Sequence, residues 1–155
     1  MRRARVSLLC AACLAASLAL SSPVRADSVK FGVRVGYYSE VDEPFVGAEV
    51  LVPVARRLYF NPNLEYVFVS EGTYLTFNAD FHYDFVVDRK TFVWLGAGLG
   101  IVHDDPGGPD NGHTDAAANF LGGIGFRAGS LIPYFQAKLI AKSGTVFAVA
   151  FGIRF

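Results

Sequence analysis

The segment Phe147-Ala148-Val149-Ala150-Phe151-Gly152-Ile153-Arg154-Phe155 alternates strictly between large apolar residues and small or charged ones. Successive side chains of a β-strand point to opposite faces of its sheet, so the alternation predicts one apolar face and one face of Ala, Gly and Arg. The pattern continues to the aromatic residue Phe155. It therefore predicts a strand that separates two unlike environments, and similar strands should precede it.

Seven further segments show the same two-residue period. Together with the last one, the predicted strands cover residues 29–38, 45–52, 60–68, 74–85, 93–101, 119–127, 134–141 and 147–155. Turn-rich stretches separate them and no helical periodicity lies between them, which predicts an all-β, eight-stranded, antiparallel up-and-down barrel. A closed barrel has no edge strand to accommodate Pro62, so we expect the third strand to begin near Leu64 or to contain a bulge.

The first 26 residues have the features of a secretory signal peptide. A basic start with Arg2, Arg3 and Arg5 precedes an apolar run over 6–20, and the small-residue site at 24–26 predicts cleavage before a mature domain of residues 27–155. Both cysteines lie in this leader, so we expect no disulfide in the mature domain. Without the leader's four arginines, ten basic residues face fourteen acidic ones, and this excess of acid argues against a nucleic-acid partner.

Volume and charge indicate which face of each strand points outward. An eight-stranded barrel has an interior only just wide enough for side chains, and the bulky apolar faces would overfill it, whereas the opposite faces contain many glycines. The apolar faces also carry no Asp, Glu, Lys or Arg, as expected where a charge would cost about 2–4 kcal/mol in lipid. We therefore expect a polar network in the lumen, made of Lys30, Arg34, Glu49, Glu65, Asp80, His82, Asp84, Arg127, Lys138 and Arg154.

The leader, the eight alternating strands and the terminal series together resemble the small eight-stranded outer-membrane barrels of the OmpA and OmpX type. The resemblance implies a monomer in the bacterial outer membrane, with both termini in the periplasm and outer loops at 39–44, 70–73, 103–116 and 142–144. It implies contact with membrane lipid and lipopolysaccharide, and a structural or surface-interaction role without catalysis. It also implies that the assembly machinery reads the series Phe147, Val149, Phe151, Ile153 and Phe155.

Three alternative functions remain open from the sequence. The lumen charges and the glycines of the fifth, sixth and eighth strands could line a narrow path for water or ions. A lipid A-modifying enzyme would need a nucleophile and a base, for which Ser70 and His103 are the candidates, although they lie on strands about 9.6 Å apart. A soluble carrier of apolar ligands would instead turn the apolar faces inward.

The predicted third outer loop is rich in oxygen ligands. Asp104, Asp105, Asp110 and Asp115 are weak candidates for binding calcium or magnesium, but their spacing is not that of an EF-hand, and the same residues are common in solvated turns. The glycine runs at 96–100 and 122–125 are not followed by a predicted helix, so they lack the geometry of a phosphate-binding loop. We expect no bound cofactor and no defined metal site.

Overall fold

The computed structural model describes residues 28–107 and 112–155 and forms one closed antiparallel barrel. The predicted signal peptide and Asp110 lie outside the described residues. The strands are β1 (Lys30–Tyr38), β2 (Glu43–Ala55), β3 (Leu58–Val67), β4 (Thr73–Val86), β5 (Thr91–Asp105), β6 (His113–Phe126), β7 (Ile132–Ala141) and β8 (Thr145–Arg154). In the described ranges, no helix has the length and apolarity needed to cross a membrane.

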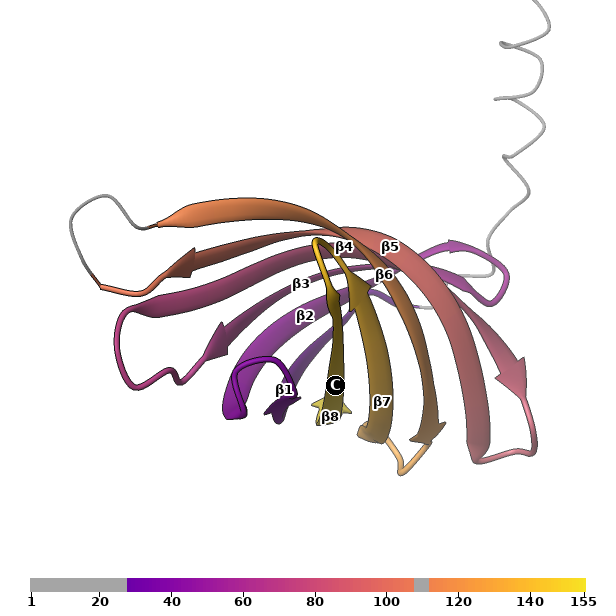
Figure 1. Cartoon of the computed structure of the whole chain (residues 1–155). Coiled ribbons are helices and arrows are strands. Elements are labelled where there is room, and N and C mark those ends of the chain that lie inside the picture. The colour runs from indigo at the N-terminus through magenta and orange to yellow at the C-terminus, as the bar shows by residue number, and fades with distance from the viewer. Residues whose placement is uncertain (1–27, 108–111) are drawn as a thin grey trace, which may run out of the picture.

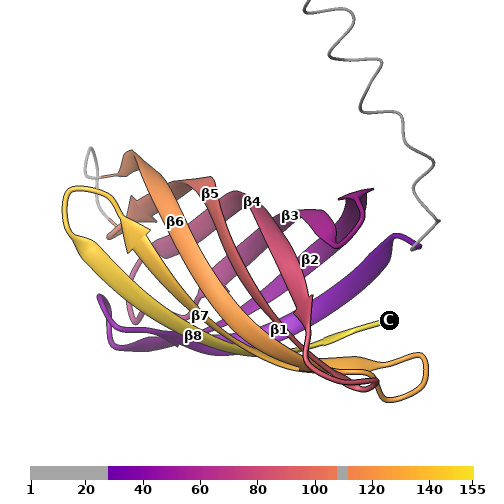
Figure 2. The ribbon, with the colours of Figure 1, turned by 90° about the vertical axis from the view of Figure 1, so that its right-hand side faces the viewer.

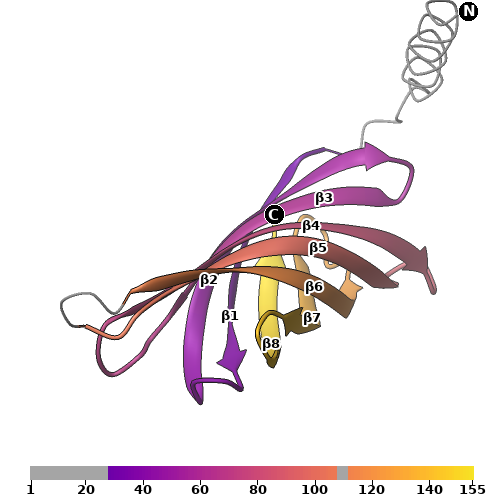
Figure 3. The same cartoon turned by 45° about the horizontal axis from the view of Figure 1, so that its top comes forward.

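Each strand pairs with its neighbours in sequence, and β8 pairs with β1 to close the sheet. Figures 1 and 3 show β8 beside β1 and β7, with the other strands curving around the opposite side. The connections divide between the two ends of the barrel. One end, called here the loop end, carries the β1–β2, β3–β4, β5–β6 and β7–β8 connections; the other, the terminal end, carries both ends of the barrel chain and the three remaining turns (Figure 2).

The side-chain phase agrees with the sequence prediction in all eight strands. The large apolar residues of the predicted outer faces are exposed, as Val33 (55%) and Leu99 (70%) show, whereas the opposite phase is buried, as Trp94 (1%) shows. In water such a continuous apolar exterior would be unfavourable, whereas hydrocarbon solvates it. The interpretation as a soluble carrier with an apolar cavity is therefore wrong.

Pro62 departs from the prediction. The expectation that the third strand begins near Leu64 is wrong, because β3 starts at Leu58 and Pro62 lies in its middle, opposite Ala79 of β4. The irregularity in the β2–β3 register falls instead between Pro53 and Ala55. The barrel therefore accommodates a proline inside a strand that is paired on both sides.

The third connection at the loop end is shorter than the predicted loop over 103–116. Strands β5 and β6 continue their pairing as far as Asp104 opposite His113, so only residues 106–112 connect them. Strands β5 and β6 thus extend the barrel wall at the loop end (Figure 2). Asp104, Asp105 and Asp115, which the sequence predicted in a solvated loop, are part of this wall.

Candidate functional site in the barrel interior

The centre of the barrel interior holds a network of buried charged and amide side chains. Arg34 of β1 forms an ion pair of 2.7 Å with Glu65 of β3 and lies 3.7 Å from Glu49 of β2. Lys138 reaches from β7 to Glu65 at 3.3 Å and to Asp80 at 3.6 Å. Because each buried charge faces an opposite one, the desolvation of these groups is offset by attraction across the lumen.

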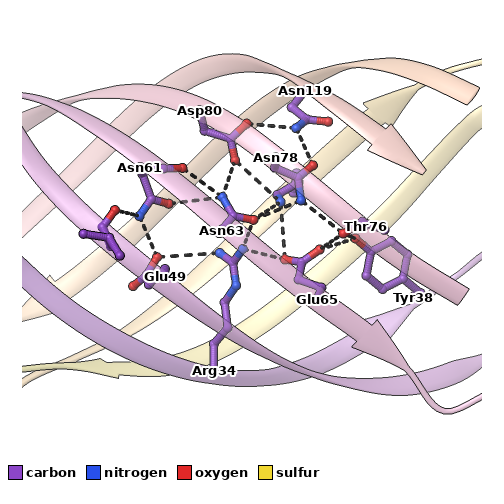
Figure 4. Close-up of polar contacts among 12 residues, drawn as sticks. Arg34, Tyr38, Glu49, Asn61, Asn63, Glu65, Thr76, Asn78, Asp80 and Asn119 are labelled. Carbon is purple, nitrogen blue, oxygen red and sulfur yellow. Dashed lines mark hydrogen bonds and ion pairs between the residues drawn. The ribbon is translucent and has the colours of Figure 1, made fainter. Parts of the chain in front are cut away.

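Uncharged side chains complete this network. Figure 4 shows Asn63 at its centre, where it donates to Asp80 at 3.0 Å, accepts from Asn78 at 3.0 Å and also accepts from Arg34. Asn119 of β6 donates to Asp80 at 2.8 Å. Side chains that the charge pattern did not single out are Tyr38, Asn61, Asn63, Thr76, Asn78, Asn119 and Gln136; their inward phase was the only sequence signal for them.

An aromatic cluster packs against the polar network on the side of the terminal end. Trp94 lies 5.6 Å from the ring of Tyr134 and 5.7 Å from that of Phe92, measured between ring centroids. The Arg154 guanidinium lies 4.3 Å from the centroid of Tyr134 and donates to Glu49 at 2.7 Å. Arg154 thus joins the aromatic cluster to the charged network by a cation–π contact and an ion pair.

A second apolar cluster fills the interior at the loop end. Tyr38 packs edge-on against Phe45 with ring centroids 5.1 Å apart, and Tyr74 lies 5.9 Å from Tyr38. Above this cluster, Glu40 accepts a hydrogen bond from the Tyr74 hydroxyl at 2.8 Å and pairs with Lys142 at 2.8 Å. Glu40 therefore joins the β1–β2 connection to the neighbouring β7–β8 connection and to Tyr74 of β4.

The inward glycines do not leave empty space. A Cβ atom on Gly123 or Gly125 would overlap the rings of Trp94 and Phe92, respectively, and one on Gly152 would lie 2.5 Å from the Tyr134 hydroxyl. Each of these three glycines lies directly opposite its aromatic partner on the neighbouring strand. The room that the sequence analysis considered for a water or ion path is thus occupied by side chains from adjacent strands.

The structure brings eight of the ten predicted lumen residues into the interior and two to its edge. Arg34, Glu49, Glu65, Asp80, His82, Asp84, Lys138 and Arg154 are all at most 5% exposed. His82 lies 3.4 Å from Asp84, between the rings of Tyr59 and Trp94. Lys30 lies at the start of β1, and Arg127 follows β6 with its guanidinium 4.6 Å from the Phe92 ring centroid.

The candidate catalytic and metal-binding residues do not assemble into sites among the described residues. Ser70 donates to Glu43 at 3.5 Å, whereas His103 contacts the Thr114 hydroxyl at 3.0 Å, so each has a different partner. Asp104 and Asp105 lie in β5 and Asp115 in β6. Within residues 28–107 and 112–155, no group of three or more His, Cys, Asp or Glu is arranged to hold a metal ion.

Solved structures of small outer-membrane barrels share this fold. The N-terminal β-barrel domain of OprF from Pseudomonas aeruginosa aligns with a TM-score of 0.63 and 13% identity, over 82% of this chain and 96% of that domain. Neisserial surface protein A aligns with a TM-score of 0.56 and 18% identity, over 81% and 94%. The outer-membrane enzyme PagL aligns with a TM-score of 0.55 and 14% identity, over 81% and 98%.

No protein-family model and no curated protein sequence matches the chain. At these identities the structural likeness establishes the fold, an eight-stranded barrel of the outer-membrane type, and the expectation drawn from the sequence resemblance is confirmed at that level. Because an enzyme and a surface protein are both among the similar structures, the fold alone does not define an activity.

Proposed function

We propose that this chain is an integral protein of the bacterial outer membrane with a structural or surface-interaction role, and that its barrel is sealed. The apolar exterior and the fold shared with outer-membrane barrels support the location. Residues 1–26 would direct export and be removed. The outward series Phe147, Val149, Phe151, Ile153 and Phe155 would contact lipid and be read by the assembly machinery, with lipopolysaccharide against the outer half of the monomeric barrel.

The packed interior is the observation that carries the proposal of a sealed barrel. The polar network occupies the centre of the interior. The aromatic cluster fills the interior toward the terminal end, and the second apolar cluster fills it toward the loop end. An ion that crossed the barrel would have to displace buried rings and break several ion pairs at once. Such a filled interior matches the general behaviour of eight-stranded barrels, which hold side chains rather than a channel.

Planar-bilayer recording tests this proposal against the channel alternative. The folded mature protein should give no discrete conductance steps in 1 M KCl. A known porin recorded under the same conditions supplies the positive control, and the variant Phe45→Ala/Trp94→Ala, which leaves the central ion pairs in place, should also give no conductance steps. Steady conductance of the unmodified protein, abolished by blocking substitutions in the interior, would support a passage for ions and overturn the sealed barrel.

The non-catalytic part of the proposal has a separate test. Ser70 and His103 contact different partners, so they do not form the nucleophile–base pair that the sequence suggested. Incubation of the folded protein with lipid A should therefore leave the lipid A mass unchanged. Loss or gain of an acyl chain that requires His103 would reassign the chain to lipid A modification.

A further inference from the structure

The exposed charges differ between the two ends of the barrel, although the exposed carboxylate of Asp88 lies among the cations of the terminal end. Five cationic side chains lie in the turns of the terminal end and are all exposed: Arg56, Arg57, Arg89, Lys90 and Arg127. This set is called here the basic rim. At the loop end the exposed or half-buried carboxylates are Glu40, Asp42, Glu43, Glu71, Asp104, Asp105 and Asp115, and the cation Lys142 is paired with Glu40. The barrel therefore presents a positive and a negative end.

Backbone hydrogen bonds hold the turns of the basic rim side by side. The Asp84 N–H at the end of β4 donates to the Arg57 carbonyl at 2.8 Å, and the Arg127 N–H donates to the Lys90 carbonyl at 2.7 Å. The three turns are thus linked across strands β2 to β6, and Figure 2 places them at the same end as the C-terminus. The cations form a continuous arc on a rigid wall rather than a set of independent loops.

The cations of the basic rim are available to a ligand. Within the described residues, no ion pair joins any of the five side chains to a carboxylate. Asp88, the carboxylate nearest to them in sequence, accepts the backbone N–H groups of Lys90 at 2.7 Å and Thr91 at 2.8 Å. Asp88 offsets one of the five positive charges and interacts electrostatically with Arg127, so the arc keeps an excess of positive charge.

Exposed apolar side chains lie directly beside the basic rim. Val86 (45%) and Val87 (63%) precede Arg89, and Leu131 (46%) lies in the turn that follows Arg127. Cations adjacent to an apolar belt are typical of the level where hydrocarbon gives way to lipid headgroups. A soluble anion would need the cations alone, whereas a lipid also uses the adjoining apolar surface.

We propose that the basic rim binds anionic phospholipid headgroups in the membrane leaflet at the terminal end of the barrel. The phosphate of an anionic phospholipid supplies the charge that the arc lacks, while its acyl chains cover Val86, Val87 and Leu131. The carboxylates of the loop end repel the same headgroups. The protein would thus gather acidic lipid on one side of the membrane only. This inference rests on the proposed membrane location.

Electron spin resonance with spin-labelled lipids tests the proposal. The folded mature protein is placed in phosphatidylcholine vesicles, and the association of labelled phosphatidylglycerol is compared with that of labelled phosphatidylcholine. A cation near an anionic surface contributes about fivefold in binding, so we expect a several-fold preference for phosphatidylglycerol at 10 mM salt. The preference should fall toward one at 1 M salt, where the screening length is about 3 Å.

Matched variants locate the effect. Arg56→Gln/Arg89→Gln should lower the preference, and neutralising all five cations to Gln should abolish it. The control Glu43→Gln/Glu71→Gln removes two charges at the loop end and should not lower the preference. If the variant with all five substitutions fails to fold, the Arg56→Gln/Arg89→Gln variant and the salt dependence of the unmodified protein still decide the outcome.

Three results would overturn the proposal. The folded barrel could show no lipid preference, or Arg56→Gln/Arg89→Gln could keep the preference as fully as the control variant does. The protein could also prefer lipid A to phosphatidylglycerol. Retention on peptidoglycan that depends on the basic rim, without a lipid preference, would assign the basic rim to a wall polymer instead.

Insertion into vesicles of pure phosphatidylcholine is measured separately, with heat-dependent electrophoretic mobility as the readout of folding. Failure to insert contradicts the proposed function, whereas insertion without lipid preference contradicts only this inference.

Discussion

The Asn61 side chain donates a hydrogen bond to the backbone carbonyl of Val50 at 3.1 Å, and this contact compensates for the proline beside it. Hydrogen-bonded pairs alternate along an antiparallel ladder. The Phe68 N–H donates to the Pro44 carbonyl of β2, and every second residue of β3 in the same register should do likewise with its own partner. At position 62, a residue with a backbone N–H would therefore donate to the Val50 carbonyl. Pro62 has no N–H, and the side-chain amide of Asn61 donates to the Val50 carbonyl instead.

Replacing Asn61 by Ala should therefore destabilise the barrel by about 1–3 kcal/mol, the cost of leaving a buried acceptor without a donor. Urea unfolding in detergent micelles measures the change. Asn61 also donates to Glu49 at 3.0 Å, so a double-mutant cycle is needed to separate the two contacts. In a Pro62→Ala background, where the backbone N–H is restored, the Asn61→Ala cost should be smaller. Equal costs in both backgrounds would contradict the compensation.

The glycines opposite aromatic rings give a second prediction. The three atoms nearest to a Cβ on Gly125 all belong to the Phe92 ring, so Gly125→Ala should cost about 1–3 kcal/mol through overpacking. Phe92→Leu should remove most of that cost in the double variant. Gly144→Ala is the matched control because nothing lies within 4 Å of its Cβ position. Thermal unfolding followed by electrophoretic mobility compares the unmodified protein with Gly125→Ala, Phe92→Leu, their double variant and Gly144→Ala. An undiminished cost of Gly125→Ala in the Phe92→Leu background would refute the steric cause.

The alternation of single strands predicted the barrel and the sidedness of its wall, because both depend only on a local two-residue period. The pairing of rings with glycines was not predictable in the same way. Trp94 and Gly123 are separated in sequence, and they meet because the β5–β6 register places them opposite each other. Register is fixed by the whole closed sheet, so the channel alternative considered from the sequence allowed for open space where the structure has a ring.

The polar network shows the same limit. The phase of each strand placed Glu65 and Lys138 on inner faces, but their contact crosses the lumen from β3 to β7. Amides such as Asn63 carry no charge and gave no signal as partners, although Asn63 contacts five members of the network. The sequence also predicted loop-end boundaries for β5 and β6 that were too short. Turn-forming residues do not indicate how far the paired strands extend beyond the apolar belt.

Glu65 is the most heavily used carboxylate of the network, which leads to a third prediction. It pairs with Arg34 and Lys138 and accepts from the Thr76 hydroxyl at 2.9 Å. Glu65→Gln should destabilise the barrel by about 3–5 kcal/mol, because two buried cations lose a counter-charge. Guanidinium unfolding measures the loss. The exposed Glu71→Gln should stay within about 0.5 kcal/mol of the unmodified protein; similar losses for both variants would disprove a special role for the buried carboxylate.

Arginine substitutions on the two faces of the wall should impair folding for different physical reasons. Val33→Arg and Phe81→Arg place a charge on the apolar exterior, at a cost of about 2–4 kcal/mol near the membrane centre. Val33→Leu should fold normally. Gly98→Arg should also fail, but for a steric reason, since a Cβ there would lie 2.5 Å from the Ala79 carbonyl oxygen. Folding yield in vesicles is the measurement, and efficient folding of Val33→Arg would exclude a lipid-facing phase.

Asp88 predicts a pH-dependent contribution from the turn between β4 and β5. The backbone N–H groups of Lys90 and Thr91 donate to its carboxylate and lower the pKa of Asp88 below its ordinary value. A carboxyl with a lowered folded-state pKa stabilises the fold above its unfolded pKa, and that stabilisation is lost as the pH falls through the folded value. The stability difference between the unmodified protein and Asp88→Ala should therefore be present at pH 7 and shrink as the pH falls below about 4. Unfolding curves at several pH values measure it, with Asp88→Asn as the control that keeps an acceptor without a titrating charge. A difference that is constant from pH 7 to pH 2 would show that the charge of Asp88 plays no part.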